Sequence, residues 1–206
     1  MEKFTTLTAP AAVLLRQNID TDIIVRIERL ITLGRKELAP YCFEALRYRE
    51  DGSDDPAFFL NDPASKGARI LLAGRNFGCG SSREGAVWAL MCVGIRCVIA
   101  PSFGDIFFNN CFQNGVLPIV LDAATIEALA DTVRPDPQAQ PLTVDLERQQ
   151  LRLANRAIGF EVDPGRREAL LKGLDEIGVT LQREPEIAAF QARDRALRPW
   201  IYETGA

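Results

Sequence analysis

The 206-residue chain has no histidine, and this absence excludes several kinds of catalytic and metal centre. A Ser-His-Asp triad, a Cys-His pair and a histidine-ligated zinc or haem site cannot be built from this chain alone. Acid–base chemistry would have to use Ser, Cys, Asp, Glu, Lys or Tyr, or a group from a partner. The five cysteines include no C-x-x-C pair, which argues against zinc and redox sites and fits free thiols in a reducing compartment.

Long apolar runs and clusters of basic residues are missing too. No stretch approaches the roughly 20 apolar residues of a membrane span. The N-terminal Met-Glu-Lys-Phe has no apolar signal core. The net charge is −4, and the lysines and arginines are dispersed. We therefore expect a cytoplasmic protein that binds neither nucleic acid nor membrane, with enough apolar residues (47%) for a substantial core.

What the chain does contain is a regular alternation of apolar segments. Strands are predicted at 11–15, 69–73, 97–100 and 117–121, and helices at 35–48, 82–94, 104–114 and 123–133. Strands separated by helices of this length indicate parallel crossovers. Short strands at 142–146, 150–153 and 158–162 predict a small antiparallel appendage, and helices are expected at 164–173 and 185–197. The predicted fold class is α/β, with a mixed, largely parallel core sheet.

The most informative segment is the glycine-rich stretch at 74–84, between a predicted strand and a predicted helix. Its three glycines allow backbone conformations that side chains forbid. Ser81, Ser82 and Arg83 follow, at the expected helix N-terminus, where free N–H groups favour anions. The P-loop and G-x-G-x-x-G patterns are both absent. The stretch predicts a site for a carboxylate or a phosphate.

Each motif also has a structural explanation. Ser81 and Glu84 form the S-x-x-E pattern of a capping box, which is compatible with a ligand role for the serine. Arg83 favours a ligand role, because a cation at a helix N-terminus opposes the dipole. Cys79 lacks a histidine to activate it as a nucleophile. The Asp-Thr-Asp sequence at 20–22 fits a local turn better than a metal site.

Several motifs in order resemble the small subunits of 3-isopropylmalate dehydratases, in the aconitase superfamily. They cover nearly the whole chain and lie at 18–24, 76–84, 99–107, 115–119 and 174–181. The resemblance implies a swivelling β/β/α three-layer domain over 1–206, with a helical C-terminal extension at about 164–206. It also implies a separate large subunit that holds a [4Fe–4S] cluster through three cysteines, in a heterodimer or heterotetramer. The implied reaction interconverts 2- and 3-isopropylmalate by dehydration and rehydration in leucine biosynthesis.

The resemblance also implies roles for individual residues. Ser81 matches the superfamily's catalytic base, which takes a proton from the carbon next to a carboxylate. Ser82, Arg83 and Thr21 match positions that bind the dicarboxylic hydroxy-acid substrate. Asp22 matches a residue that faces the site and orients the serine or an arginine. The metal would belong to the partner and not to this chain.

One position departs from the family pattern. A histidine usually follows Ser-Ser-Arg-Glu, whereas this chain has Gly85. The departure implies a change in substrate or in helix packing. Two alternatives stay open: a related hydro-lyase for another malate derivative, such as citramalate or a dimethylmalate, and a non-catalytic anion-binding or assembly paralogue. The presence of Asp22, Ser81, Ser82 and Arg83 argues against the second.

Overall fold

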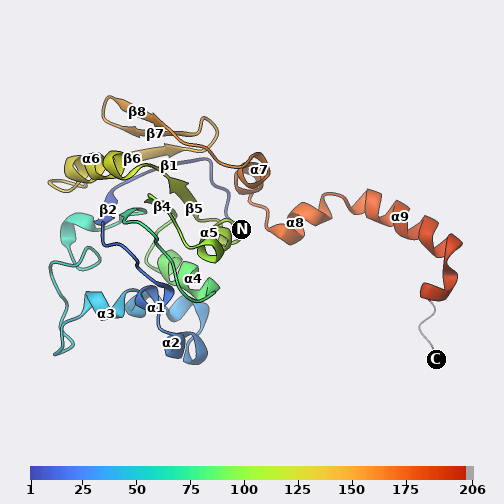
Figure 1. The fold of residues 1–206 in the computed structure, drawn as a ribbon, viewed down its shortest axis with the longest axis horizontal. Helices are drawn as coiled ribbons and strands as arrows, with labels where there is room; N and C mark the ends of the chain where they lie inside the picture. The colour runs from blue at the N-terminus through green and yellow to red at the C-terminus, as the bar shows by residue number, and fades with distance from the viewer. Residues whose placement is uncertain (203–206) are drawn as a thin grey trace.

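The computed structural model describes residues 1–202 and contains two four-stranded sheets (Figure 1). The first sheet is parallel throughout, in the order β2 (Ala11–Leu14), β3 (Ile70–Ala73), β4 (Cys97–Ala100) and β5 (Leu117–Val120). Strands β3 and β4 are buried along their whole length. Burial on both faces explains why these strands are continuous apolar runs without alternation.

The second sheet is antiparallel, in the order β1 (Thr6–Ala9), β6 (Leu142–Asp145), β7 (Gln150–Leu153) and β8 (Arg156–Gly159). It has as many strands as the parallel sheet, so the expectation of a small appendage and a mixed core sheet is corrected. Strand β1, which the sequence did not predict, is separated from β2 by Pro10 and pairs with β6. Strand β8 begins two residues before the predicted start, directly after a turn in which Ala154 has φ 50°.

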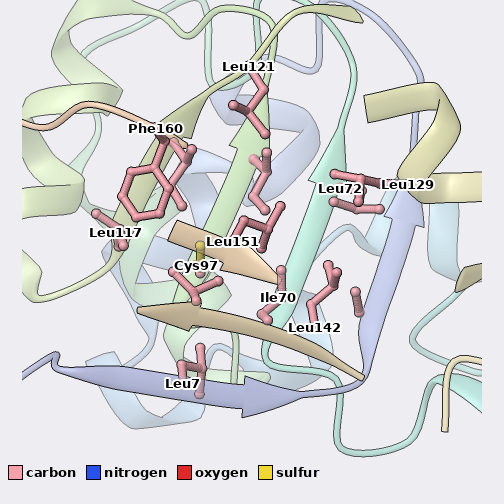
Figure 2. Packing of buried hydrophobic residues seen from close by; sticks show 14 of the residues in the cluster. Leu7, Ile70, Leu72, Cys97, Leu117, Leu121, Leu129, Leu142, Leu151 and Phe160 are labelled. Carbon is pink, nitrogen blue, oxygen red and sulfur yellow. The ribbon is translucent and has the colours of Figure 1, made fainter. Parts of the chain in front are cut away.

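The two sheets stack face to face and enclose one of two hydrophobic cores. Leu7, Leu142 and Leu151 of the antiparallel sheet meet Ile70 and Leu72 of the parallel sheet in this core (Figure 2). Helix α6 (Ala123–Val133) contributes one apolar face to the same core. Successive strand residues point to opposite faces of the sheet, so Leu71, between Ile70 and Leu72, enters the other core.

The second core lies between the parallel sheet and a layer of helices. Leu71 and Val98 of the sheet pack with α4 (Glu84–Cys92), α5 (Asp105–Asn114), α1 (Thr21–Ile24) and the segment around α3 (Glu44–Arg47). Helix α4 is buried at five of its nine positions, as its apolar sequence predicted. The three layers are therefore antiparallel sheet, parallel sheet and helices, which confirms the predicted β/β/α fold class.

The helix predicted over 35–48 is broken in the structure. Helix α2 (Ile27–Thr32) is followed by two short 3-10 turns, Arg35–Glu37 and Ala39–Tyr41, and then by α3. Two local features explain the break. Pro40 disfavours a helical conformation in the residue before it, and Phe43 has a left-handed backbone with φ 57°.

The C-terminal helices follow the antiparallel sheet. Helix α7 (Pro164–Lys172) is capped by Asp163 and ends at Gly173, which has φ 73°. Helices α8 (Glu176–Leu181) and α9 (Glu184–Leu197) and the 3-10 turn η4 (Pro199–Ile201) then extend away from the sheets (Figure 1). We call residues 176–202 the arm. The end of the predicted extension, residues 203–206, lies outside the described residues, and the single-domain division stays a prediction.

None of the helices within residues 1–202 has both the length and the apolar character that crossing a bilayer requires.

Candidate active site

The glycine-rich loop joins β3 to α4 and is held between the two neighbouring loops. On one side the Gly78 amide donates to the Ile19 carbonyl at 2.7 Å, and the Thr21 amide donates to the Cys79 carbonyl at 2.9 Å. On the other side the Phe77 amide donates to the Ser102 carbonyl at 3.1 Å. Because carboxyl ends of adjacent parallel strands meet at one sheet edge, the three loops after β2, β3 and β4 lie together.

Two glycines in this loop are required by its shape. Gly78 has φ 70°, and a Cβ built on it would lie 2.2 Å from the Phe107 ring. Gly80 has φ 89°, next to Asp20 and Thr21. No other residue type adopts these conformations without strain. The positive φ values of these two glycines confirm that the loop uses backbone conformations that side chains forbid.

Ser81 lies at the end of this loop, and Thr21 fixes its backbone. The Thr21 side chain is buried, and its hydroxyl donates to the Ser81 carbonyl at 2.9 Å. Ser81 and Ser82 are exposed, and within residues 1–202 their hydroxyls have no hydrogen-bond partner. The structure thus presents two free hydroxyls on a fixed backbone. The Thr21 hydroxyl is buried beside them and binds the backbone, so it is not accessible at the surface.

Arg83 and Asp22 form an ion pair across the same surface. The Arg83 side chain is 14% exposed, whereas the Asp22 side chain is 52% exposed. The orientation of the Arg83 guanidinium is therefore fixed by packing, while the Asp22 carboxylate remains open to water. Of the five predicted site residues, the structure brings four to one surface and places Thr21 directly below.

The helix begins later than predicted. Helix α4 starts at Glu84. Its N-cap residue is Arg83, which has an extended backbone and whose side chain makes no capping hydrogen bond. Ser81 therefore precedes the helix by three residues and is not its cap. The Glu84 carboxylate accepts a hydrogen bond from the Asn114 side chain at 2.8 Å. The capping-box interpretation is wrong, because Asn114 has taken the carboxylate that the motif required.

Asn114 is buried and is the centre of a polar network that the sequence did not reveal. Its side-chain oxygen accepts from the Trp88 indole at 3.0 Å and from the Arg35 guanidinium at 2.8 Å. Arg35 also stacks over the Trp88 ring, 4.9 Å from its centroid. This network fastens the segment after α2 to helix α4. In the sequence Asn114 is one of five polar residues in α5, so nothing distinguished it from the others.

The departure from the family pattern at Gly85 has a structural counterpart. Gly85 is buried, and a Cβ built on it would lie 2.5 Å from both methyl carbons of Leu30. Leu30 of α2 therefore occupies the space in which a side chain at position 85 would start. Helix α2 packs onto the first turn of α4 because that turn has a glycine.

The alternative roles at Cys79 and Asp20 find no support in the geometry. Burial, followed by the Asp20 carboxylate, raises the pKa of the Cys79 thiol, which keeps it protonated. Asp20 caps α1 by accepting from the Ile23 amide at 2.7 Å, so the turn interpretation is confirmed. Across residues 1–202, no three His, Cys, Asp or Glu side chains come together in a way that could hold a metal ion.

The two largest cavities described lie away from the loop. One of about 640 Å³ is lined by residues around Arg47, Tyr48 and Lys66. The other, of about 660 Å³, lies between α5, α7 and α8, next to Arg166. Neither is lined by a residue of the 74–83 loop. The exposed Ser81 and Ser82 thus lie on the surface and outside these two cavities.

Comparisons with known proteins show the family to which the chain belongs. The family model for the aconitase C-terminal domain matches residues 1–124. A second family model, for the C-terminal domain of the 3-isopropylmalate dehydratase small subunit, matches residues 176–203.

Full-length relatives are similar over nearly the whole chain. The 3-isopropylmalate dehydratase small subunit of Paramagnetospirillum magneticum is 52% identical over 202 residues, which are 98% of this chain and 100% of that protein. The protein of the same name from Rhodopseudomonas palustris (strain TIE-1) is 50% identical over 97% of this chain and 100% of its own length. The crystal structure of 3-isopropylmalate dehydratase from Methanocaldococcus jannaschii has a TM-score of 0.64 and 27% identity, covering 89% of this chain and 98% of that one.

Proposed function

Since the chain belongs to the family of 3-isopropylmalate dehydratase small subunits, we propose that it is the small subunit of this hydro-lyase. The reaction interconverts 2-isopropylmalate and 3-isopropylmalate by loss and return of water, in leucine biosynthesis. The observation that carries the proposal is the convergence of Ser81, Ser82, Arg83 and Asp22 on one open surface.

Ser81 is the proposed base that removes the proton from the carbon beside a substrate carboxylate. A serine hydroxyl is a weak base, so its alkoxide needs stabilisation by nearby positive charge and N–H groups. The Arg83 guanidinium lies two residues away, and the open N-terminus of α4 follows directly. The bond from Thr21 supports this role, because it fixes the backbone that carries the Ser81 hydroxyl. We therefore assign Thr21 a positioning role and not direct contact with substrate.

Arg83 and Ser82 are the proposed ligands of a substrate carboxylate. A guanidinium binds a carboxylate through two parallel hydrogen bonds, which fixes its orientation. In the free chain Asp22 holds the Arg83 side chain toward the surface. Asp22 thereby sets the direction of Arg83 before substrate arrives.

Departure of the substrate hydroxyl needs a Lewis acid or a proton donor. The [4Fe–4S] cluster of a large subunit would supply a Lewis acid for that hydroxyl. The partner would also cover the open surface and exclude water. The assembly is a heterodimer or a heterotetramer in the cytoplasm.

The test is reconstitution of the full chain with a cluster-bearing large subunit. Ser81→Ala should abolish turnover and leave association unchanged, because the hydroxyl is exposed and has no protein partner within residues 1–202. Ser82→Ala is the neighbouring control and should raise KM more than it lowers kcat. Wild-type turnover by the Ser81→Ala enzyme would remove Ser81 from the mechanism.

The alternative substrates require a separate comparison. Leu30 fills the space at Gly85, which supports a rearranged packing and not a degenerate site. Turnover measured with isopropylmalate, citramalate and a dimethylmalate would rank the candidates. Activity restricted to one of the latter two would assign a related hydro-lyase, and binding without turnover of any would favour the non-catalytic paralogue.

A further inference from the structure

The arm is the part of the described chain whose structure is least explained by its own contacts. Helix α9 has 14 residues, and its principal contact is with η4, the turn that follows it. Helix α9 and η4 extend away from both sheets (Figure 1). Isolated helices shorter than about 12–15 residues are marginal in water. A helix this short is expected to be stabilised by packing on something else.

One face of the arm is apolar. Ile187, Phe190 and Leu197 share one side of α9 by their helical spacing, and they are 38%, 53% and 68% exposed. Trp200 and Ile201 continue the apolar surface through η4. We call these five residues the apolar stripe.

The acidic residue within this face is already neutralised. Asp194 accepts hydrogen bonds from Arg198 at 2.7 Å and from the Tyr202 hydroxyl at 2.7 Å, and it is 8% exposed. The stripe is therefore not interrupted by a free charge. The end of the arm has a defined shape, because Tyr202 is also stacked under Arg195 at 5.0 Å.

The apolar stripe is well exposed for so short a segment. Its five side chains are between 38% and 68% exposed. On helix α8, Ile177 and Leu181 share one side by their i, i+4 spacing and are 70% and 59% exposed. Exposed apolar surface of this kind marks interaction sites.

We propose that the arm binds the large subunit, in an apolar groove with an acidic rim. The groove would receive the apolar stripe, and the acidic rim would face Arg193 and Arg195, which flank it. This inference rests on the proposed function, because it needs the two-subunit enzyme. It goes further in that it gives the arm a separate task from the 74–83 loop.

The two family matches favour the large subunit over a second copy of this chain. Residues 1–124 correspond to the C-terminal domain of aconitase, where such a domain is joined covalently to the rest of its protein. Residues 176–203 match a model specific to the small subunits. A domain on a separate chain needs a non-covalent attachment, and the arm is the segment that matches the small-subunit model.

The test uses the full chain with single substitutions on opposite faces of α9. Leu197→Asp places a charge in the stripe, and Ala192→Asp places the same charge on the opposite, exposed face. Far-UV circular dichroism checks that both variants keep their helix. Affinity for the large subunit is measured by calorimetric titration, and turnover is measured at saturating small subunit.

Leu197→Asp should weaken binding about 10- to 100-fold, while Ala192→Asp binds within about twofold of wild type. The kcat of the saturated Leu197→Asp enzyme should match wild type, because the 74–83 loop is unchanged. Equal affinity for all three chains would overturn the inference, as would a homodimer that Leu197→Asp dissociates without affecting the large subunit. If the wild-type chain binds the large subunit but the complex has no turnover, the proposed function is contradicted. The role of the arm in binding is not affected by that result.

Discussion

Replacing Gly85 by alanine tests the packing of α2 behind the site. The added Cβ would lie 2.5 Å from both Leu30 methyl carbons, where ordinary contacts are 3.4–4 Å, so Leu30 must retreat by close to 1 Å. Overpacking of this kind costs about 1–3 kcal/mol. Alanine in a helix gains up to ~1 kcal/mol over glycine. The net expectation is a loss of up to about 2 kcal/mol, or a Tm lower by up to roughly 8 °C for a chain of this size.

A second substitution separates this overlap from other effects. Leu30→Ala removes the atoms that the new Cβ would meet, so the double variant should keep the helical gain without the overlap. The expected coupling energy in thermal or urea unfolding is about 1–3 kcal/mol. Gly159→Ala is the control, because a Cβ there meets nothing within 4 Å and its φ lies outside the left-handed region. Additive effects of the two substitutions would show that Leu30 does not fill the space at Gly85.

Three further outcomes follow from the site. Asn114→Ala leaves the half-buried Trp88 indole without its acceptor, while water can reach the exposed Arg35 and Glu84, so unfolding should become easier by about 1–3 kcal/mol in urea titrations; an unchanged midpoint would contradict the network. The raised pKa of the Cys79 thiol means less thiolate at neutral pH, so site-resolved mass spectrometry should find slower alkylation than in an unstructured cysteine peptide, and equal or faster alkylation would refute it. Thr21→Val loses the bond to the Ser81 carbonyl and should lower kcat of the reconstituted enzyme about tenfold with little change in Tm; a full kcat would remove Thr21 from positioning.

The elements with strong local signals could be predicted from the sequence. Helix α6 occupies the predicted residues 123–133, because Asp122 caps it and its apolar residues repeat with helical spacing. Strand β4 also has the predicted bounds. In both cases local propensity and tertiary packing favour the same structure.

The elements that depend on distant contacts could not be predicted. The helix expected over 35–48 breaks where Phe43 takes a left-handed backbone, and Phe43 packs against Phe58 and Phe59. Strand β1 is short and is defined by pairing with β6, more than 130 residues away in the sequence. The residues that decide these two structures lie outside the segments themselves, so local propensity does not reveal them.

The same division applies to the site. The local motif was sufficient to predict the glycine turn, whereas the helix N-terminus expected at the two serines lies at Glu84. The proximity of Asp22 and Arg83 was expected only from the family resemblance, since 61 residues separate them. No sequence signal predicted the hydrogen bond from Asn114 to Glu84, and this bond occupies the carboxylate that the capping box would have used.

The central claim is that the 74–83 loop is half of an active site that another polypeptide completes. The most direct measurement is a titration of the purified full chain into a fixed amount of large subunit, with isopropylmalate dehydration followed by ultraviolet absorbance of the unsaturated product. We predict no turnover by the chain alone and a rise in rate that saturates at one small subunit per large subunit. Turnover by the isolated chain, or no increase on mixing with a large subunit that it binds, would contradict the account.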